Sequence, residues 1–201
     1  MSIQSSNITA DVLGAATRAR RAIGALFFTF FGAAWVLAWA RLGHLALPVV
    51  VGAVFLATAI LMPAALAQIR RNKAATEATE GLPETKRRAR IFHIVNVAQW
   101  VLILVAINVF NNLGFGAWQM PAVMMIVGAH FLPLARVFRN RALLWAGLAI
   151  MAVACGYPGI AEGGPTNPVG CLCTGLILWM SAAWAVRETL VQAVYRRTVL
   201  G

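Results

Sequence analysis

Residues 127–141, VGAHFLPLARVFRNR, combine the three features that decide the fold of this chain. The stretch begins as an apolar run, carries a histidine and a proline inside that run, and ends in a cluster of arginines. Apolar runs that end in basic residues are typical of membrane-spanning helices, whose cytoplasmic ends carry Lys and Arg. The same pattern recurs along the rest of the chain.

The composition is that of a protein whose solvent is lipid. Of its 201 residues, 61% are hydrophobic and 11% are charged, and the mean hydropathy is +0.77, whereas soluble domains carry about 25% charged residues. The net charge of +11 would suggest nucleic-acid binding in a soluble protein. Here the basic residues lie at the ends of apolar runs, where they set membrane orientation. We therefore predict a lipid-bilayer protein with no nucleic-acid partner.

Six apolar runs are long enough to cross a hydrocarbon core of about 30 Å, which takes about 20 helical residues. They predict an all-α, polytopic membrane bundle of about six transmembrane helices within residues 22–190. The predicted helices are 22–40, 46–68, 91–112, 117–138, 142–160 and 169–190. Five helices are the alternative, because the fifth run closes on Gly156 and Pro158. The first run also has features of a secretory signal, but its length favours a retained helix.

All basic residues except Arg41 fall on one side of the predicted bundle. By the positive-inside rule this side is cytoplasmic, which predicts cytoplasmic termini at 1–21 and 191–201 and a solvated cytoplasmic loop at 69–90. Arg and Ala enrichment suggests a bacterial genome and hence the inner (plasma) membrane. Because juxtamembrane basic residues attract anionic lipid, we expect the flanks of this loop to lie against headgroups.

A weak internal repeat relates two of the predicted helices. VGAVFLATA at 51–59 and VGAHFLPLA at 127–135 agree at six of nine positions. The match hints at three helical hairpins of like orientation. In the alignment Val54 stands where His130 stands, and Ala57 where Pro133 stands. The polar and the kinking residue are thus departures from a plainer helix.

Polar residues form stripes on three predicted helices, each stripe on one face at about 100° per residue. The candidate residues for a substrate or ion path are His93, Asn96 and Asn108 on the third helix, Gln119, His130 and Pro133 on the fourth, and Ser181 and Glu188 on the sixth. Polar side chains at membrane depth normally face the bundle interior or a wet cavity. The alternative is that they only hydrogen-bond helices together. The first, second and fifth helices are predicted to face lipid.

His130 is the residue hardest to explain structurally. It lies about 9 to 13 Å below Arg136 and Arg139 at 1.5 Å per residue, which is near the bilayer midplane. Pro133 lacks an N–H and so frees the carbonyl of Ala129 beside it. Freed carbonyls on kinked helices bind ions and substrates in transporters. The alternative is an ordinary kink that neighbouring helices satisfy.

The cysteines leave two interpretations open, and the sequence contains no catalytic motif. Cys155, Cys171 and Cys173 fall near the outer ends of the last two predicted helices, where a disulfide between Cys155 and Cys171 or Cys173 is one option and apolar packing the other. No catalytic signature is present, so no catalytic residue is assigned. The inward-facing His and acidic residues are too few for a metal site. We predict no cofactor and no metal.

Three functions fit these observations. The first is a transporter or channel-like protein for a small solute or ion, with a polar path on the third, fourth and sixth helices and His130 and Glu188 in a proton-linked version. The second is a membrane enzyme acting on a lipid or isoprenoid, with His93, His130 and Glu188 as acid/base groups. The third is a non-catalytic assembly subunit. The sequence favours the first and leaves open whether the chain is an enzyme or a homo-oligomer.

Overall fold

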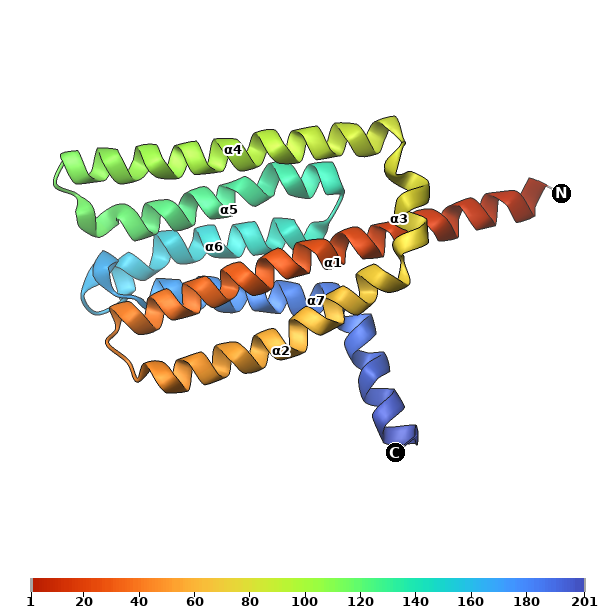
Figure 1. Ribbon diagram of the computed structural model, residues 1–201. Coiled ribbons are helices and arrows are strands. Elements are labelled where there is room, and N and C mark those ends of the chain that lie inside the picture. The colour runs from red at the N-terminus through yellow and green to blue at the C-terminus, as the bar shows by residue number, and fades with distance from the viewer. Residues whose placement is uncertain (1, 201) are drawn as a thin grey trace.

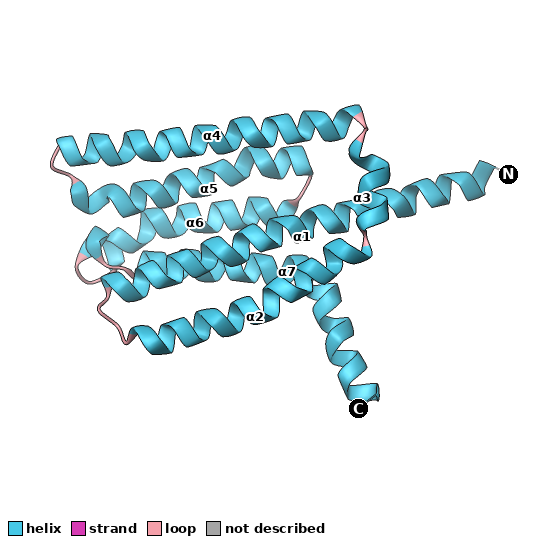
Figure 2. Cartoon of the chain, in the orientation of Figure 1, coloured by secondary structure: helices cyan, strands magenta, loops and turns pink. Residues whose placement is uncertain are grey.

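The computed structural model describes residues 2–200, which are almost entirely helical with short connections (Figures 1 and 2). Over this range the helices are α1 (Ser2–Leu42), α2 (Leu47–Arg71), α3 (Lys73–Glu80), α4 (Pro83–Asn112), α5 (Gln119–Phe138), α6 (Arg141–Ile160) and α7 (Val169–Leu200), with short 3-10 helices η1 (Gly116–Trp118) and η2 (Gly164–Thr166). Six of them are long and apolar enough to cross a membrane. The prediction of an all-α, six-span membrane bundle is therefore confirmed.

Three helices extend past the predicted spans, always at the same end of the bundle. α1 starts at Ser2, α4 starts at Pro83, and α7 continues to Leu200. The predicted terminal segments 1–21 and 191–201 are thus helical continuations of the first and last spans, apart from residues 1 and 201, which lie outside the described residues. Pro83 stands in the first turn of α4, where its missing N–H costs no hydrogen bond.

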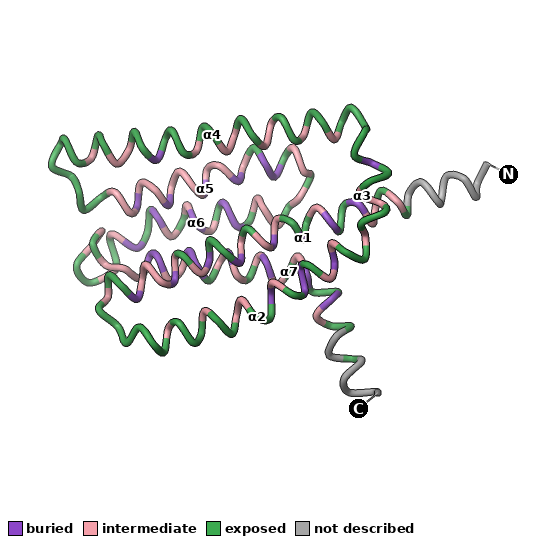
Figure 3. The backbone as a smooth tube through the Cα atoms, in the orientation of Figure 1, coloured by how far each residue is buried: buried purple, intermediate pink, exposed green. Residues whose placement is uncertain are grey.

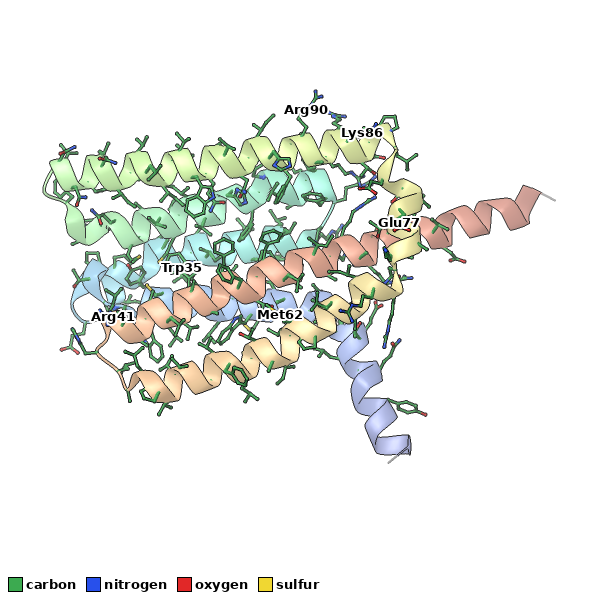
Figure 4. All side chains as sticks on the ribbon, in the orientation of Figure 1. Trp35, Arg41, Met62, Glu77, Lys86 and Arg90 are labelled. Atoms are coloured by element: carbon green, nitrogen blue, oxygen red, sulfur yellow. The ribbon has the colours of Figure 1, made fainter. Side chains whose placement is uncertain are left out.

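The chain crosses the bundle six times, and both termini lie at the same end as α3 (Figure 1). This end, named the basic end, holds every Lys and Arg of the described residues except Arg41. Figure 4 shows Lys86 and Arg90 there and Arg41 at the opposite, far end. The hairpins α1–α2, α4–α5 and α6–α7 all start at the basic end, as the internal repeat predicted (Figure 1).

α1 packs through a seam of small side chains. Ala16, Ala19, Ala22 and Ala25 follow one another at three-residue intervals and are each at most 1% exposed. In lipid the hydrophobic effect gives no reason for helices to associate, so close packing of small residues supplies most of the attraction. This seam places α1 against α2, α3 and α7. The prediction that the first helix faces lipid is therefore wrong, because its contact face carries alanine instead of polar residues.

Two glycine pairs bring helix backbones into direct contact. A Cβ on Gly128 of α5 would lie 2.8 Å from the carbonyl oxygen of Gly147 on α6, and one on Gly147 would lie 2.7 Å from that of Gly128. A Cβ on Gly175 of α7 would lie 2.9 Å from the carbonyl oxygen of Gly32 on α1. Such distances admit no side chain. These contacts fix α5 against α6 and α1 against α7.

α4 is the outlying helix of the bundle. Ile103 is the one residue of α4 that is buried, and Figure 3 shows the helix exposed along most of its length. Within the described chain α4 packs against α5, α3 and η1, and it makes no close backbone approach to α1 or α7. The flank of the bundle between α1 and α4 is therefore not closed by helix packing.

The segment between α2 and α4 is docked on the bundle, whereas the sequence predicted a solvated loop. Arg20 of α1 donates hydrogen bonds to Thr79 Oγ1 at 2.9 Å and to Thr85 Oγ1 at 3.3 Å. Thr79 is only 3% exposed. The helical path of this segment breaks at Gly81 and Leu82, because α3 ends at Glu80 and α4 begins at Pro83.

The glycine contact between α5 and α6 makes a testable prediction. Gly147→Ala is expected to lower the free energy of unfolding by about 1 to 3 kcal/mol, because the new methyl must push two backbones apart. Gly52→Ala on α2 is the matched control, since a Cβ there meets nothing within 4 Å. Thermal unfolding in detergent measures both. Equal melting temperatures for the two variants would contradict the packing described.

Candidate functional site

A cavity of about 1030 Å³ lies between α1, α4, α5 and α7. It reaches the basic end, where the arginines of its wall are mostly exposed. Its wall on α1 runs from Thr17 to Trp35, about 27 Å at 1.5 Å per residue, which exceeds half of a hydrocarbon core of about 30 Å. Its volume is at the upper end of ligand pockets, which span about 300 to 1,000 Å³. The unpacked flank between α1 and α4 borders it.

Five of the eight predicted path residues line this cavity. They are His93 and Asn96 on α4, His130 on α5, and Ser181 and Glu188 on α7. These are the three helices on which the sequence showed polar stripes. Gln99, which lies off the stripe of its helix, also lines the cavity. The structure thus brings together residues that are up to 95 positions apart, from His93 to Glu188.

The other three predicted residues lie outside the cavity wall. Asn108 donates to the carbonyl of Leu104 in its own helix at 2.8 Å. Gln119 donates to Asn111 Oδ1 at 2.5 Å, a bond that ties α5 to α4 near the far end. Pro133 is exposed on the outer face of α5. The polar stripes therefore do not form one continuous polar path along the helices.

Among the described residues, the predicted path residues that α4 and α7 place on the cavity wall make no hydrogen bonds between helices, whereas Gln68, Arg20 and Thr85 at the basic end of the wall do. Ser181 Oγ donates to the carbonyl of Ile177, four residues back in the same helix, at 2.8 Å. The side chains of His93 and Asn96 make no hydrogen bond with the described residues, and Glu188, which is exposed, forms no ion pair with them. Interhelical bonding would require partners on neighbouring helices. These groups are instead available to water or to a ligand.

Interhelical hydrogen bonds are made by a residue that the sequence analysis did not single out. Gln68 of α2 is 5% exposed, donates to the backbone carbonyl of Arg18 at 3.0 Å, and accepts from Thr189 Oγ1 at 3.0 Å. It joins α1, α2 and α7 at the basic end. The sequence could have predicted this role from the position of Gln68 in the last turns of an apolar run, because a buried amide there needs hydrogen-bond partners on other helices.

His130 sits at the inner part of the cavity wall with one nitrogen unpaired. Its Nδ1 is buried and has no hydrogen-bond partner among the described residues. The ring lies near the backbone carbonyl of Val95 on α4 and edge-on to Phe131, with 5.5 Å between the ring centroids. The imidazole thus lies between α4 and α5 with one buried nitrogen that no described residue satisfies.

Arginines that the sequence analysis took only as topology anchors also form the cavity wall at the basic end. They are Arg18, Arg20, Arg21, Arg88, Arg139, Arg141 and Arg187. The single carboxylate among the lining residues is Glu188. Arg187 stacks on Trp184, 4.3 Å from the ring centroid, and Arg88 pairs with Glu84. The mouth of the cavity is therefore strongly cationic.

The inner wall of the cavity is apolar. Toward the far end, beyond Gln99, His130 and Ser181, the described lining residues are apolar. Those that α1 contributes there are aromatic. Arg21, Phe28 and Trp35 are seven residues apart and share one face of α1. This seven-residue spacing is visible in the sequence and could have predicted that α1 lines the cavity, because it places an arginine and two aromatic residues on one helix face.

The structure also places the three cysteines and the side chains that could bind a metal ion. Cys155, Cys171 and Cys173 are free, with Cys155 exposed and Cys171 buried, so the structure gives the predicted disulfide no support. A buried thiol that packs as a small apolar group is the alternative that fits Cys171. Among the described residues, no three His, Cys, Asp or Glu side chains meet in a group that could hold a metal ion.

Comparisons of the chain with protein-family models, with curated proteins and with solved structures find no match. What the protein does must therefore be argued from the cavity itself.

Access to the cavity from water can be tested with single cysteines in a background where the three native cysteines are replaced. Ser181→Cys is expected to react with a membrane-impermeant methanethiosulfonate, because Ser181 lines the cavity. Met180→Cys is the control, since Met180 is 64% exposed on the outer face of the same helix and would meet lipid. Mass spectrometry of the labelled protein reads the outcome. Equal labelling of both positions would contradict a water-accessible cavity at Ser181.

The free nitrogen of His130 makes a second prediction. His130→Leu removes a buried polar atom that has no partner, so the free energy of unfolding is expected to stay within about 1 kcal/mol of wild type or to rise. Thermal unfolding in detergent measures it. A melting temperature several degrees lower would show that the imidazole is a structural residue, and would remove it from the functional site.

Proposed function

We propose that this multi-pass membrane protein is a transporter of the bacterial inner membrane that holds its substrate in the cavity between α1, α4, α5 and α7. The observation that carries the proposal is that the cavity reaches the basic end and that its wall includes His93 and Asn96, whose side chains make no hydrogen bond with the described residues. The basic end faces the cytoplasm under the positive-inside rule, and its flanking basic residues contact anionic headgroups.

The cavity wall favours a carrier over an open channel. The lining residues stop at Trp35, Ile103 and Val123, and about 10 Å of α1 lies between Trp35 and its end at Leu42. Channels need a polar route through the whole membrane, whereas carriers expose a site near the midplane to one side at a time. The described conformation corresponds to the state that is accessible from the basic end.

The ionisable groups of the cavity support a proton-linked cycle. His130 lies at the inner part of the wall and Glu188 near the basic end of the same cavity. Ionisable side chains inside membrane bundles commonly belong to proton relays. In such a cycle His130 and Glu188 take and release the proton, and the free Nδ1 of His130 is the site that receives it.

A membrane enzyme acting on a lipid or isoprenoid is the second candidate. One observation favours it, namely that His93, His130 and Glu188 all line the same cavity. An enzyme needs no exposure of its site to the far side. An assembly subunit has less support, because His93, Asn96 and Ser181 on the cavity wall make no hydrogen bonds between the described helices.

Accessibility of the inner cavity separates these functions without knowledge of the substrate. In the cysteine-replaced background, Ile103→Cys on α4 is expected to react with an impermeant thiol reagent from both sides of the membrane, because a carrier alternates between two openings. Leu104→Cys is the matched control, since Leu104 is 59% exposed to the outside and does not line the cavity. Inside-out and right-side-out vesicles present the two faces separately.

Reaction of Ile103→Cys from one face only would overturn the transporter and leave the enzyme. Conversion of a co-purified lipid by the wild type but not by Glu188→Gln would then establish catalysis. The same vesicles test the orientation, because Ser181→Cys is expected to react faster in inside-out vesicles, in which the cytoplasmic side faces the reagent. Faster reaction in right-side-out vesicles would reverse the assigned topology.

A further inference from the structure

We infer that the substrate of this cavity is an anionic amphiphile, with a phosphate or carboxylate head group among the arginines of the basic end and a hydrocarbon chain along the aromatic inner wall. The inference rests on the proposed function for the role of the cavity, and it adds the chemical class of the molecule that the cavity takes. It follows from three separate properties of the wall: its charge, its apolar depth and its open flank.

The charge of the mouth selects an anion. Seven arginines line the cavity at the basic end against one carboxylate, Glu188. Arg18, Arg21, Arg139 and Arg141 make no side-chain hydrogen bond or ion pair with the described residues, so their guanidinium groups are available. Guanidinium groups bind phosphate and carboxylate oxygens in a bidentate manner. Topology alone would be served by basic residues pointing anywhere at this end.

The inner wall selects a hydrocarbon chain. Phe31 and Trp35 of α1 and Trp100 of α4 line the part beyond the polar residues, and Phe27 and Phe28 line the wall at about the level of His130. A small polar anion would leave this surface without a partner. The line from Arg21 to Trp35 is about 21 Å long on one helix, so one extended molecule can contact both ends. The cavity volume of about 1030 Å³ is larger than a small solute needs.

The flank between α1 and α4 gives such a molecule a route from the bilayer. Among the described residues these two helices make no close backbone approach, although both line the cavity. Arg20 donates a hydrogen bond to Thr85 across this flank at 3.3 Å, a side-chain contact that an entering anionic head group would displace. Water-soluble substrates need an opening at a membrane face, whereas an amphiphile moves within the leaflet and enters from the side. The head group stays level with the basic end during this movement, which avoids the cost of burying its charge in hydrocarbon.

Arg139 contributes positive charge at the mouth of the cavity although its backbone conformation is unfavourable for a residue other than glycine. It follows the last turn of α5 with a φ of 48°, in the left-handed region that favours glycine. Its N–H and that of Asn140 satisfy the last carbonyls of α5, at Arg136 and Ala135. Glycine would make the same turn without strain. The guanidinium at this position therefore serves something other than the turn, and it lines the cavity.

Binding to the purified full-length chain in a neutral detergent tests the inference, with native mass spectrometry as the readout. The probes are dioleoyl phosphatidylglycerol, a polyprenyl phosphate and oleate, which share an anionic head and a long chain. Dioleoyl phosphatidylcholine supplies the same chains without net charge, and glycerol phosphate supplies the head alone. We expect at least one anionic amphiphile to bind with one equivalent and at least tenfold more tightly than either control.

Two sets of variants locate the site. Arg21→Gln with Arg139→Gly is expected to weaken binding roughly tenfold or more, because two charge-assisted contacts are lost. Arg139→Gly alone is expected to keep or raise the melting temperature, so that weaker binding cannot be attributed to unfolding. Lys86→Gln with Arg90→Gln removes the same charge from the outer side of α4, away from the cavity (Figure 4), and is expected to leave binding within twofold.

The possible outcomes distinguish an error in the substrate class from an error in the proposed transport function. Equal binding of phosphatidylcholine would overturn the head-group site, and equal binding of glycerol phosphate would overturn the chain site. Equal loss in the Lys86/Arg90 pair would show that general surface charge, and not the cavity, attracts the anion. If no amphiphile binds while Ile103→Cys still reacts from both faces, the transporter stands and the substrate class is wrong. If an anionic amphiphile binds while Ile103→Cys reacts from one face only, the substrate class stands and the transporter is wrong.

Discussion

The contact between helix backbones at small residues is the constraint on which the rest of this structure depends. Lipid gives helices no hydrophobic reason to associate. Gly32 against Gly175 and Gly128 against Gly147 bring α1 to α7 and α5 to α6 as closely as backbones allow. α4 has no equivalent contact and buries only Ile103. The cavity exists because α1 packs closely on α7 and α5 on α6, while the backbone of α4 stands apart from that of α1.

The arginines at the basic end satisfy two requirements with the same side chains. A positive end fixes how the bundle sits in the membrane, and a positive rim gives the cavity its selectivity. The first requirement is met by any basic residue at this end, as Lys86 and Arg90 on the outside of α4 demonstrate (Figure 4). The second needs a position on the cavity wall, and only part of the basic set occupies one.

Hydropathy, length and charge asymmetry predicted the helices and their alternation, because each of these is a property of single segments. Polar stripes predicted which faces of α4, α5 and α7 turn inward, and His93, Asn96, His130, Ser181 and Glu188 do line one cavity. The stripes failed at Asn108, Gln119 and Pro133, because a shared helix face says nothing about depth along the helix. The role of α1 was missed, since alanines that pack tightly look the same in sequence as alanines that face lipid. Which helices touch depends on contacts between distant segments, and Gly32 and Gly175 carry no mark that pairs them.

The pairing of α1 with α7 has a consequence for how the protein is made. Of the six described spans, α1 leaves the ribosome before the others and α7 after them, yet Gly32 and Gly175 form one of the closest contacts in the bundle. Until α7 is inserted, the alanine and glycine face of α1 toward it has only lipid as a neighbour. The contact between α1 and α7 therefore forms only after all six described spans are inserted, and a chain that stops after α6 lacks the partner of this face of α1.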